Sequence, residues 1–473
     1  MKNVKLSKLW DSLHSSYWFI PTLMAASSII LAWAMLTVDR TGGTPNWWWI
    51  YTGGTDGARS LLSAVAGSMV SVVPTAFSIT IVALQLASST FGPRLLRNFM
   101  QDIGNQIAIG TFIATFMYCL LVLRTIHGEG DGYSFFVPHL SVTVGTVLAI
   151  ASMGVLIYFI YHASTIIQAS HIITQVSGDL DKTIDRLFPE QIAQSAAKKS
   201  WQVGEIPVNF EEEASPTKAA ADGDLRAIDD DELMKITRKY NLLVRVKTRP
   251  GKFIIKGSDL ALVFPGERVN RELTQLINDA FIVGKERTEY QDAEFPINQL
   301  VEIAWRAISP GINDPFTAIR CIHRFSAGLS RIAQRDFSSP YRYGGEDNLR
   351  VIVEVATFEG LVNSAFNHTR HYGYTDVAVT IRLLEAIARI APYTRSNKDR
   401  ALLLRHAGMI ERGSLEKITE ECDRASIYYS ALRSSHQSFK ARLIVCPIDP
   451  PRPRYYGRST GHDLRPKGNL INF

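Results

Sequence analysis

The sequence predicts a mainly α-helical membrane protein, in which four transmembrane helices precede a cytosolic α+β domain with a small β module. Two observations indicate this class. The N-terminal part contains four long stretches without a charged side chain, whereas charges recur every few residues further along. In the charged part, short apolar runs with Gly and Pro turns predict strands between 242 and 264, and apolar residues at helical spacing follow. These patterns exclude a wholly soluble enzyme and a disordered chain.

Four apolar segments are long enough to cross a bilayer, which takes about 20 residues of helix. They cover approximately Tyr17–Val38, Leu61–Ala87, Ile107–Ile126 and Phe135–Tyr161. Backbone polar groups in lipid must be paired within the protein, and helices of this length achieve that. Residues 1–163 are therefore predicted to form a four-helix transmembrane domain.

The distribution of Lys and Arg predicts the orientation of these helices. Basic residues are concentrated in the N-terminal segment, in the loop between the second and third spans, and after the fourth span. The two opposite loops contain only Arg40, Arg59 and Arg124. Because Lys and Arg accumulate on the cytoplasmic side, we expect a multi-pass plasma-membrane protein with both termini in the cytoplasm.

The remainder of the chain divides into several predicted regions. Apolar residues at helical spacing continue past the fourth span and predict a stalk that rests on another helix, in this chain or in a second copy. Leu349–Glu354 is predicted to be a later strand, and a helix is expected over Asn298–Ile308 and another over Asn270–Val283. The predicted regions are a cytosolic helical stalk at 164–200, a polar linker at 201–223, a small β module at 224–268, a helical cytosolic domain at 269–446 and a flexible basic tail at 447–473.

The second span carries polar side chains at steps of three and four residues, with one valine completing the series. The positions are Ser68, Ser71, Thr75, Ser78, Val82, Gln85 and Ser89. On a helix they share one face. Hydroxyl and amide groups without partners are costly in lipid, so this face should point toward other helices or toward water.

Two interpretations of this polar stripe remain open. Small residues and hydroxyls are common where membrane helices pack together. The alternative is a pore lining, in which hydroxyls replace part of an ion's hydration shell. Gln85 is larger than a packing contact needs, and Pro74 can free a backbone carbonyl. Arg94 and Arg97 would form a basic mouth that favours anions.

The leading hypothesis is an oligomeric ion-conducting membrane protein with a cytosolic assembly or gating domain. One stripe cannot enclose a pore, so several copies are required. The expected partners are the lipid bilayer, ions and further copies of the chain, and no nucleic acid. A membrane-anchored enzyme or ligand sensor and a non-catalytic membrane scaffold are the alternatives.

A turn in the second half of the chain is the candidate site for the enzyme or sensor alternative. Pro310-Gly311 is typical of a turn, Asp314 of a helix N-cap and Pro315 of a first helical residue. The competing interpretation is a contact with a ligand or another subunit. The candidate residues for that contact are Arg287, Asp292, Asn313 and Asp314.

No motif in the sequence predicts catalysis, a metal or a cofactor. The four cysteines form no CxxC pair, which argues against a zinc site or a disulfide framework. His368 and His371 are three residues apart, but no third ligand accompanies them in the sequence. Phosphate-binding glycine motifs are also absent from the sequence.

Three runs of sequence resemble a family of bacterial predicted membrane proteins known as domain of unknown function 2254. They are Ile81–Leu96 (IVALQLASSTFGPRLL), Arg249–Pro265 (RPGKFIIKGSDLALVFP) and Arg287–Ala318 (RTEYQDAEFPINQLVEIAWRAISPGINDPFTA). The resemblance extends from the first helix to about Leu432. It implies a four-helix membrane region with a cytosolic domain, and it implies neither a reaction nor a substrate. Where the family usually has glycine, this chain has Pro296.

Overall fold

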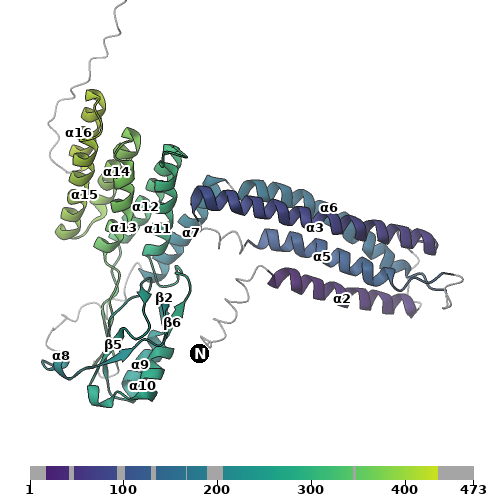
Figure 1. The fold of residues 1–473 in the computed structure, drawn as a ribbon, viewed down its shortest axis with the longest axis horizontal. Helices are drawn as coiled ribbons and strands as arrows, with labels where there is room; N and C mark the ends of the chain where they lie inside the picture. Colours follow the sequence, from purple (N-terminus) through teal and green to yellow (C-terminus); the bar gives the residue numbers. More distant parts are fainter. Residues whose placement is uncertain are drawn as a thin grey trace, which may run out of the picture.

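The computed structural model has two parts, a bundle of long helices and a C-terminal domain of helices and small sheets (Figure 1). It describes residues 18–41, 47–92, 102–128, 135–166, 168–188, 206–344 and 348–434. The described residues are mostly helical, and strands occur only in the C-terminal domain. The predicted fold class is confirmed.

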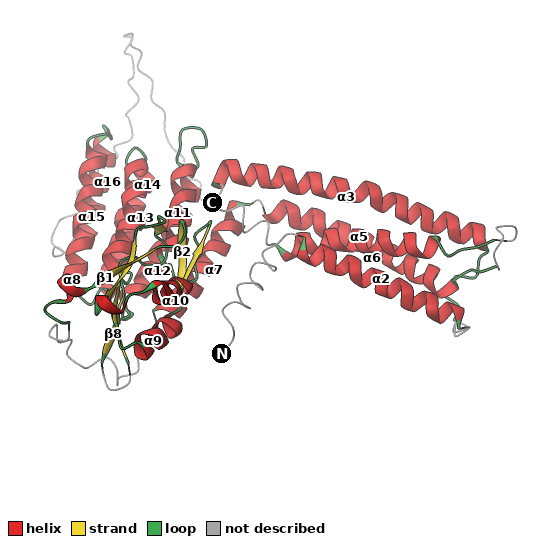
Figure 2. Ribbon diagram, turned by 60° about the horizontal axis from the view of Figure 1, so that its bottom comes forward, coloured by secondary structure: helices red, strands yellow, loops and turns green. Residues whose placement is uncertain are grey.

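Four helices form the membrane bundle. They are α2 (Phe19–Arg40), α3 (Thr55–Phe91), α5 (Ile103–Leu123) and α6 (His139–Ile166). Each is long and apolar enough to cross a membrane, as predicted. With 37 residues, α3 is about 55 Å long, whereas the hydrocarbon core of a bilayer is about 30 Å thick. One end of α3 therefore projects beyond the bundle, which Figure 2 also shows.

Helix α5 is the centre of the bundle and packs against the other three helices. Its Phe112 and Tyr118 are fully buried. The hydroxyls of Thr115 on α5 and Ser152 on α6 lie 2.9 Å apart in the interior. At the end of the bundle far from the C-terminal domain, Asp39 accepts hydrogen bonds from two backbone N–H groups in the first turn of α6. These contacts pair polar groups that lipid would leave unsatisfied.

The helical pattern that continues past the fourth span is divided between two helices, because α6 ends at Ile166 and α7 (Ala169–Leu187) follows. Between them, Gln168 has an extended backbone with ψ of 131°. The apolar face of α7, which includes Ile173, Val176 and Leu180, is buried against α11 (Glu294–Ala307) and α12 (Pro315–Ala333). The stalk thus rests on helices of its own chain.

Two small sheets form the β part of the C-terminal domain. The five-stranded sheet has the order β1-β5-β3-β8-β7, and the three-stranded sheet has the order β4-β2-β6. All neighbouring strands are antiparallel except β3 and β8. The strands are β1 (Ser215–Lys218), β2 (Gly223–Ile228), β3 (Leu243–Val246), β4 (Phe253–Ile254), β5 (Asp259–Phe264), β6 (Phe281–Gly284), β7 (Tyr341–Tyr343) and β8 (Leu349–Ile352). The short elements α8 (Phe210–Glu213), α9 (Asp230–Lys239), η3 (Gly266–Arg268) and α10 (Arg271–Asp279) accompany them.

Parts of this region differ from the prediction. Residues 210–218, expected to belong to a linker, form α8 and the edge strand β1. The helix predicted over 270–283 ends at Asp279, and Phe281–Gly284 pairs with β2 instead. Phe, Ile and Val fit a strand well once a partner strand is present, so tertiary pairing overrides the local helical pattern.

Seven helical segments of the described chain form a buried core. The end of α3 and the helix α7, which both come from the membrane bundle, pack against this core. Beyond α11 and α12, the segments of the core are α13 (Phe358–Gly373), α14 (Val377–Ile390), η5 (Ala391–Tyr393), α15 (Asn397–Leu415) and α16 (Glu421–Ser434). We call this the helical core. Its buried cluster also contains Ala87 and Phe91 of α3 and the apolar face of α7.

The beginnings of α11 and α12 follow local rules. Helix α11 starts at Glu294, four residues before the predicted start, so Pro296 lies in its first turn. A proline is accepted there because the first N–H groups of a helix have no helical partner. As predicted, Asp314 caps α12: its carboxylate accepts from the N–H of Thr317 at 3.1 Å, and Pro315 follows directly.

His406 of α15 makes the stability of the helical core depend on pH. It is fully buried, and its Nε2 lies 2.9 Å from Oδ1 of Asn363. Burial, with Arg405 and Arg370 nearby, lowers the pKa of His406 to about 4. In the unfolded chain the imidazole takes up a proton near pH 6.5. The contribution of neutral, buried His406 to the free energy of unfolding is therefore complete above that pH. It is lost as the pH falls from 6.5 to about 4, and it amounts to about 3 kcal/mol.

We therefore expect His406→Gln to flatten the decline of the unfolding free energy between pH 6.5 and 4. Denaturant titrations of the full-length protein in detergent at several pH values measure this slope. His368→Gln is the matched control, since His368 is exposed on the neighbouring helix α13. Equal slopes for native protein and His406→Gln would contradict the assignment.

Candidate ion path along helix α3

The seven positions of the predicted polar stripe lie on one exposed face of α3. Ser68, Ser71, Thr75, Ser78, Val82, Gln85 and Ser89 are all exposed. The opposite face is buried in the bundle and, at the end of the helix, in the helical core, through Leu62, Ala66, Met69, Ala76, Ala83, Ala87 and Phe91. Among the described residues, the stripe thus takes no part in packing within the bundle.

The hydroxyls of the stripe already use their protons within α3. Thr75 donates to the carbonyl of Ser71 at 2.9 Å, and Ser78 donates to the carbonyl of Pro74 at 2.9 Å. Ser68, Ser71 and Ser89 make the same kind of bond to carbonyls three or four residues earlier. Their oxygen lone pairs remain available to water or an ion on the outer side. Pro74 has no N–H, so the carbonyl of Val70 also lacks its helical donor.

One part of the polar stripe lies beside α5, and the other part lies beyond the end of α5. Arg59 near the start of α3 donates to the carbonyl of Ile126, just beyond α5, so the two helices are antiparallel. Ala76 shares a buried cluster with Ala108 of α5, which lies about 8 Å from the start of that helix. Helix α3 consequently passes the end of α5 at roughly residue 81. The hydroxyls from Ser68 to Ser78 lie at the level of α5, whereas Val82, Gln85 and Ser89 lie beyond the end of that helix.

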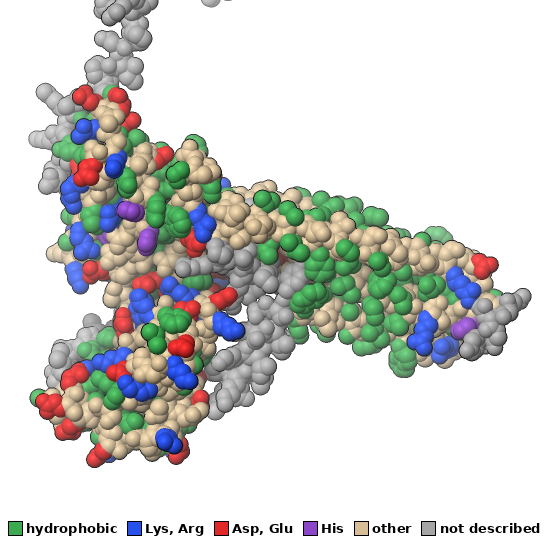
Figure 3. All heavy atoms as spheres, viewed as in Figure 1, with side chains coloured by type: hydrophobic (Ala, Val, Ile, Leu, Met, Phe, Trp, Pro, Cys, Tyr) green, Lys and Arg blue, Asp and Glu red, His purple; other side chains and the backbone are tan. Residues whose placement is uncertain are grey.

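The exterior of the bundle is suited to lipid. Figure 3 shows a broad apolar surface over it, and in this view Lys, Arg, Asp and Glu occur at its far end and on the C-terminal domain. Exposed apolar side chains on α2 and α6 include Ile30, Trp33, Ile150 and Ile157. Within this exterior, the row of hydroxyls on α3 is chemically distinct.

The projecting end of α3 is fixed to the helical core. Ala87 and Phe91 are 1% and 7% exposed and belong to the core's buried cluster. The helix ends at Gly92, whose φ of 110° favours glycine. A side chain there would collide with the Glu302 carboxylate of α11. Glu302 and Arg306 form an ion pair of 3.4 Å beside this end. Arg94 and Arg97, the predicted basic mouth, lie outside the described residues.

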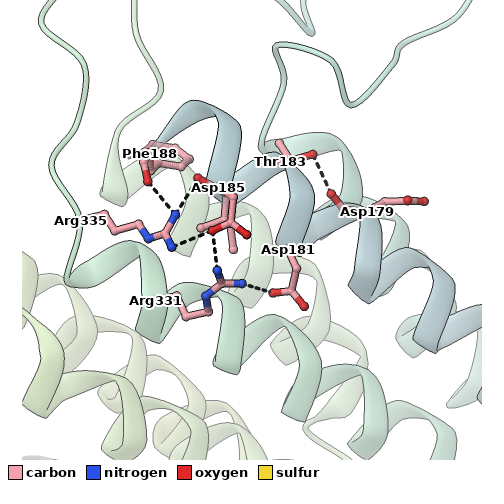
Figure 4. A network of polar contacts seen from close by, with 8 residues as sticks. Asp179, Asp181, Thr183, Asp185, Phe188, Arg331 and Arg335 are labelled. Atoms are coloured by element: carbon pink, nitrogen blue, oxygen red, sulfur yellow. Dashed lines mark hydrogen bonds and ion pairs between the residues drawn. The ribbon is translucent and has the colours of Figure 1, made fainter. Parts of the chain in front are cut away.

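The second connection between the bundle and the helical core is α7, which is held by Arg331 at the end of α12 and by Arg335 just beyond that helix (Figure 4). Arg335 donates to the carbonyls of Ile184 at 3.1 Å and Phe188 at 2.7 Å, and to the Asp185 carboxylate at 2.7 Å. It thereby supplies a donor to the Phe188 carbonyl at the C-cap of α7 and a second donor to the Ile184 carbonyl, which also accepts from the N–H of Phe188. Arg331 bridges Asp181 and Asp185 on the surface of the same helix.

Replacing Arg335 with alanine should destabilise the protein by about 2–3 kcal/mol, because buried carbonyls lose a charged donor. Its side chain is only 8% exposed. Arg331→Ala, four residues earlier at the end of α12, is the control. Arg331 is 36% exposed and its partners are more exposed, so its loss should cost less than about 1 kcal/mol. Unfolding of the full-length protein in detergent measures both, and equal effects would refute the capping role.

The remaining candidate residues occupy opposite ends of α11. Arg287 and Asp292 precede it and form a pair, with Nη2 and Oδ2 2.5 Å apart. Asn313 and Asp314 follow it, about 20 Å away along the helix. Asn313 has a φ of 52° and donates its N–H to the carbonyl of Ser309. The structure therefore brings together each pair but not all four residues.

Asp292 lies in a buried ionic cluster that the sequence reasoning found only in part. Its side chain is fully buried and caps α11 by accepting from the N–H of Glu294 at 3.0 Å. Burial raises the pKa of Asp292, and Arg287 opposes this. Arg249, which the sequence indicated only as part of a turn, lies 2.6 Å from the Glu294 carboxylate, with both side chains about 90% buried. Neither a motif nor a fixed spacing signals this pairing.

Gly251 allows the turn after β3 to approach this cluster. Its φ is 88°, and a side chain there would overlap the Asp292 carboxylate. The Arg249–Glu294 pair then joins the sheets to the first turn of α11. The geometry is that of a joint between two parts of the C-terminal domain, and every charge named here has a partner.

No group of three or more His, Cys, Asp or Glu side chains in the described ranges could hold a metal ion. His368 and His371 are both exposed, and His371 makes edge contacts with Tyr372 and Tyr374.

Comparisons with known proteins agree with the membrane architecture. A family model described as "Predicted membrane protein (DUF2254)" matches residues 14–389. The chain is 28% identical over 433 residues to the uncharacterized protein Rv1290c of Mycobacterium tuberculosis and to Mb1321c of Mycobacterium bovis. The matched region is 90% of this chain and 81% of each relative. No solved structure matches the chain. Because the family model covers most of the sequence, the chain belongs to the DUF2254 family of predicted membrane proteins.

Proposed function

We propose that several copies of this protein assemble into an ion-conducting membrane protein in which α3 lines the path. The observation that carries the proposal is the polar stripe, which is exposed on the face of α3 opposite its packed face. The hydroxyl protons are used within α3, but the outward oxygen lone pairs would find no donor in lipid. Copies arranged around an axis would turn the stripe toward water and leave the apolar exterior toward lipid.

The C-terminal domain assembles or gates this path. Two features support this role: the end of α3 is buried in the helical core, and α7 is held by Arg331 and Arg335. We place this domain in the cytosol of a bacterial cell, on the inner side of the plasma membrane with both termini, because Lys and Arg are concentrated on that side. Arg94 and Arg97 would then give the path a basic mouth that favours anions.

A membrane-anchored enzyme or ligand sensor with a site at Asn313 and Asp314 has less support. The Asp314 carboxylate caps α12, and the adjoining turn is closed by its own backbone hydrogen bonds. A purely structural membrane scaffold explains the fold but gives no reason for the hydroxyl row.

The test is to reconstitute the purified protein into proteoliposomes, to record currents in planar bilayers in chloride and gluconate salts, and to image the particles. A ring of protomers with α3 at its centre and a current carried by ions would support the proposal. A monomer, or a ring whose centre is occupied by a different helix, would refute it. Equal currents in chloride and gluconate would remove the anion preference alone.

A further inference from the structure

We infer that Val82 and Leu86 form a hydrophobic gate at the cytosolic end of the path. This inference rests on the proposed function, in which the stripe of α3 faces the axis of an oligomer. Val82 is 58% exposed and Leu86 is 52% exposed in the protomer. They are one turn apart, so they present a continuous apolar patch on the face that continues the hydroxyl row.

The chemistry of the stripe changes where α3 leaves the bundle. From Ser68 to Ser78, each of the four stripe positions carries a hydroxyl. The next stripe position is Val82, and Leu86 lies within about 40° of it around the helix at about 100° per residue. Both lie beyond residue 81, where α3 has passed the end of α5. This exposed apolar pair lies beside the last turn of α6 and is flanked on the stripe by Gln85 and Ser89.

The occupant that covers this patch is the same pair in neighbouring copies. The hydroxyl row and the apolar pair share one helix and one face, so any arrangement that brings the first to an axis brings the second there as well. Side chains of Val and Leu meeting around an axis form an apolar constriction. Such a constriction blocks ions without a solid plug, because water leaves a narrow apolar pore and ions cannot pass without it.

The same two turns of α3 carry the contact with the helical core. Phe91 lies about 180° around the helix from Val82, and Ala87 about 140° from it. Both are buried in the core's cluster. Helix α3 has no break between these positions, so a rotation or tilt of the core moves Val82 and Leu86 directly. The core contact therefore sets the width of the constriction.

Serine at either gate position tests the inference. We expect Val82→Ser and Leu86→Ser to raise the open probability of the reconstituted protein by on the order of tenfold, because a hydroxyl keeps the constriction hydrated. Unitary conductance should change little, since the hydroxyl-lined part is unaltered. The control is Ile81→Ser. Ile81 is 61% exposed but lies about 100° away from Val82, so the same change should leave open probability unaltered.

A second variant tests the link to the helical core. Phe91→Ala should change open probability while Val82→Ser/Phe91→Ala stays as open as Val82→Ser alone. Size-exclusion profiles and thermal unfolding of each variant identify any that fail to fold, and Val82→Thr, which keeps the shape of valine, is then used in place of Val82→Ser.

The possible results distinguish failure of the gate inference from failure of the proposed ion conduction. No current from the native protein or from any serine variant would overturn the proposed function and the gate together. Native current with open probability unchanged in Val82→Ser, Val82→Thr and Leu86→Ser would overturn the gate and leave the pore intact. An equal rise in Ile81→Ser would also overturn the gate, because the effect would not depend on the face of the helix.

Discussion

Replacing Thr75 with leucine is expected to lower the unitary conductance of the reconstituted protein to about a tenth of the native value. Thr75 lies midway along the hydroxyl row, at the level of the bundle, and is exposed, whereas the adjacent Ala76 is buried. Leucine removes an oxygen that can contact a partly dehydrated ion and places a larger apolar group at the same position. In an oligomer every copy carries the substitution, so each copy contributes to the loss of conductance.

The matched control for Thr75→Leu is Val70→Leu. Val70 is 54% exposed on α3, at the level of the bundle, but outside the stripe. An added methylene group there faces lipid or a neighbouring helix and should leave conductance within about twofold of native. Thr75→Ser keeps the hydroxyl and should also conduct normally. Native conductance in Thr75→Leu would show that the hydroxyl row does not line the path.

Replacing Arg287 with methionine is expected to destabilise the protein by about 3–5 kcal/mol at neutral pH, the largest stability effect anticipated for a single substitution here. The change leaves the fully buried Asp292 carboxylate without its nearest cation. Burial already raises the pKa of Asp292, and loss of Arg287 would raise it further. The destabilisation should therefore diminish as the pH falls through this raised pKa, since the folded protein then takes up a proton.

Chemical unfolding of full-length Arg287→Met in detergent between pH 8 and 5 measures both effects. Lys218→Ala removes one partner of the exposed Lys218–Asp259 pair and should cost less than about 1 kcal/mol at every pH. The double variant Arg287→Met/Asp292→Asn should recover part of the loss, because no unpaired charge then remains buried in the cluster. A loss that is independent of pH would argue against a charged, unpaired Asp292 as its cause.

The parts of the fold that local chemistry determines could be predicted from sequence. The four apolar spans and the Asp314 cap depend on residues close in the chain, and the structure confirms them. Strands β1 and β6 were missed because they exist only through pairing with distant strands, β5 and β2. The Arg249–Glu294 pair likewise depends on the approach of two segments that no spacing rule connects.

The stripe on α3 illustrates the same limit at the candidate site. Its spacing predicts that Ser68, Thr75 and Gln85 share a face, and they are all exposed on one side of the helix. Spacing alone does not indicate whether that face meets the bundle or leaves it. The answer depends on the small residues opposite, such as Ala76 and Ala83, against which the neighbouring helices pack.

The path of the chain through the five-stranded sheet limits how this protein can be divided. After β6 the chain builds α11 and α12, and only then returns to add β7 and β8 beside β3. Sheet and helical core are therefore interleaved, and a cut at residue 268 would leave β3 as a bare edge open to association with foreign strands. Shortened versions for expression should retain residues 168–434 together, because the apolar face of α7 is buried in the helical core.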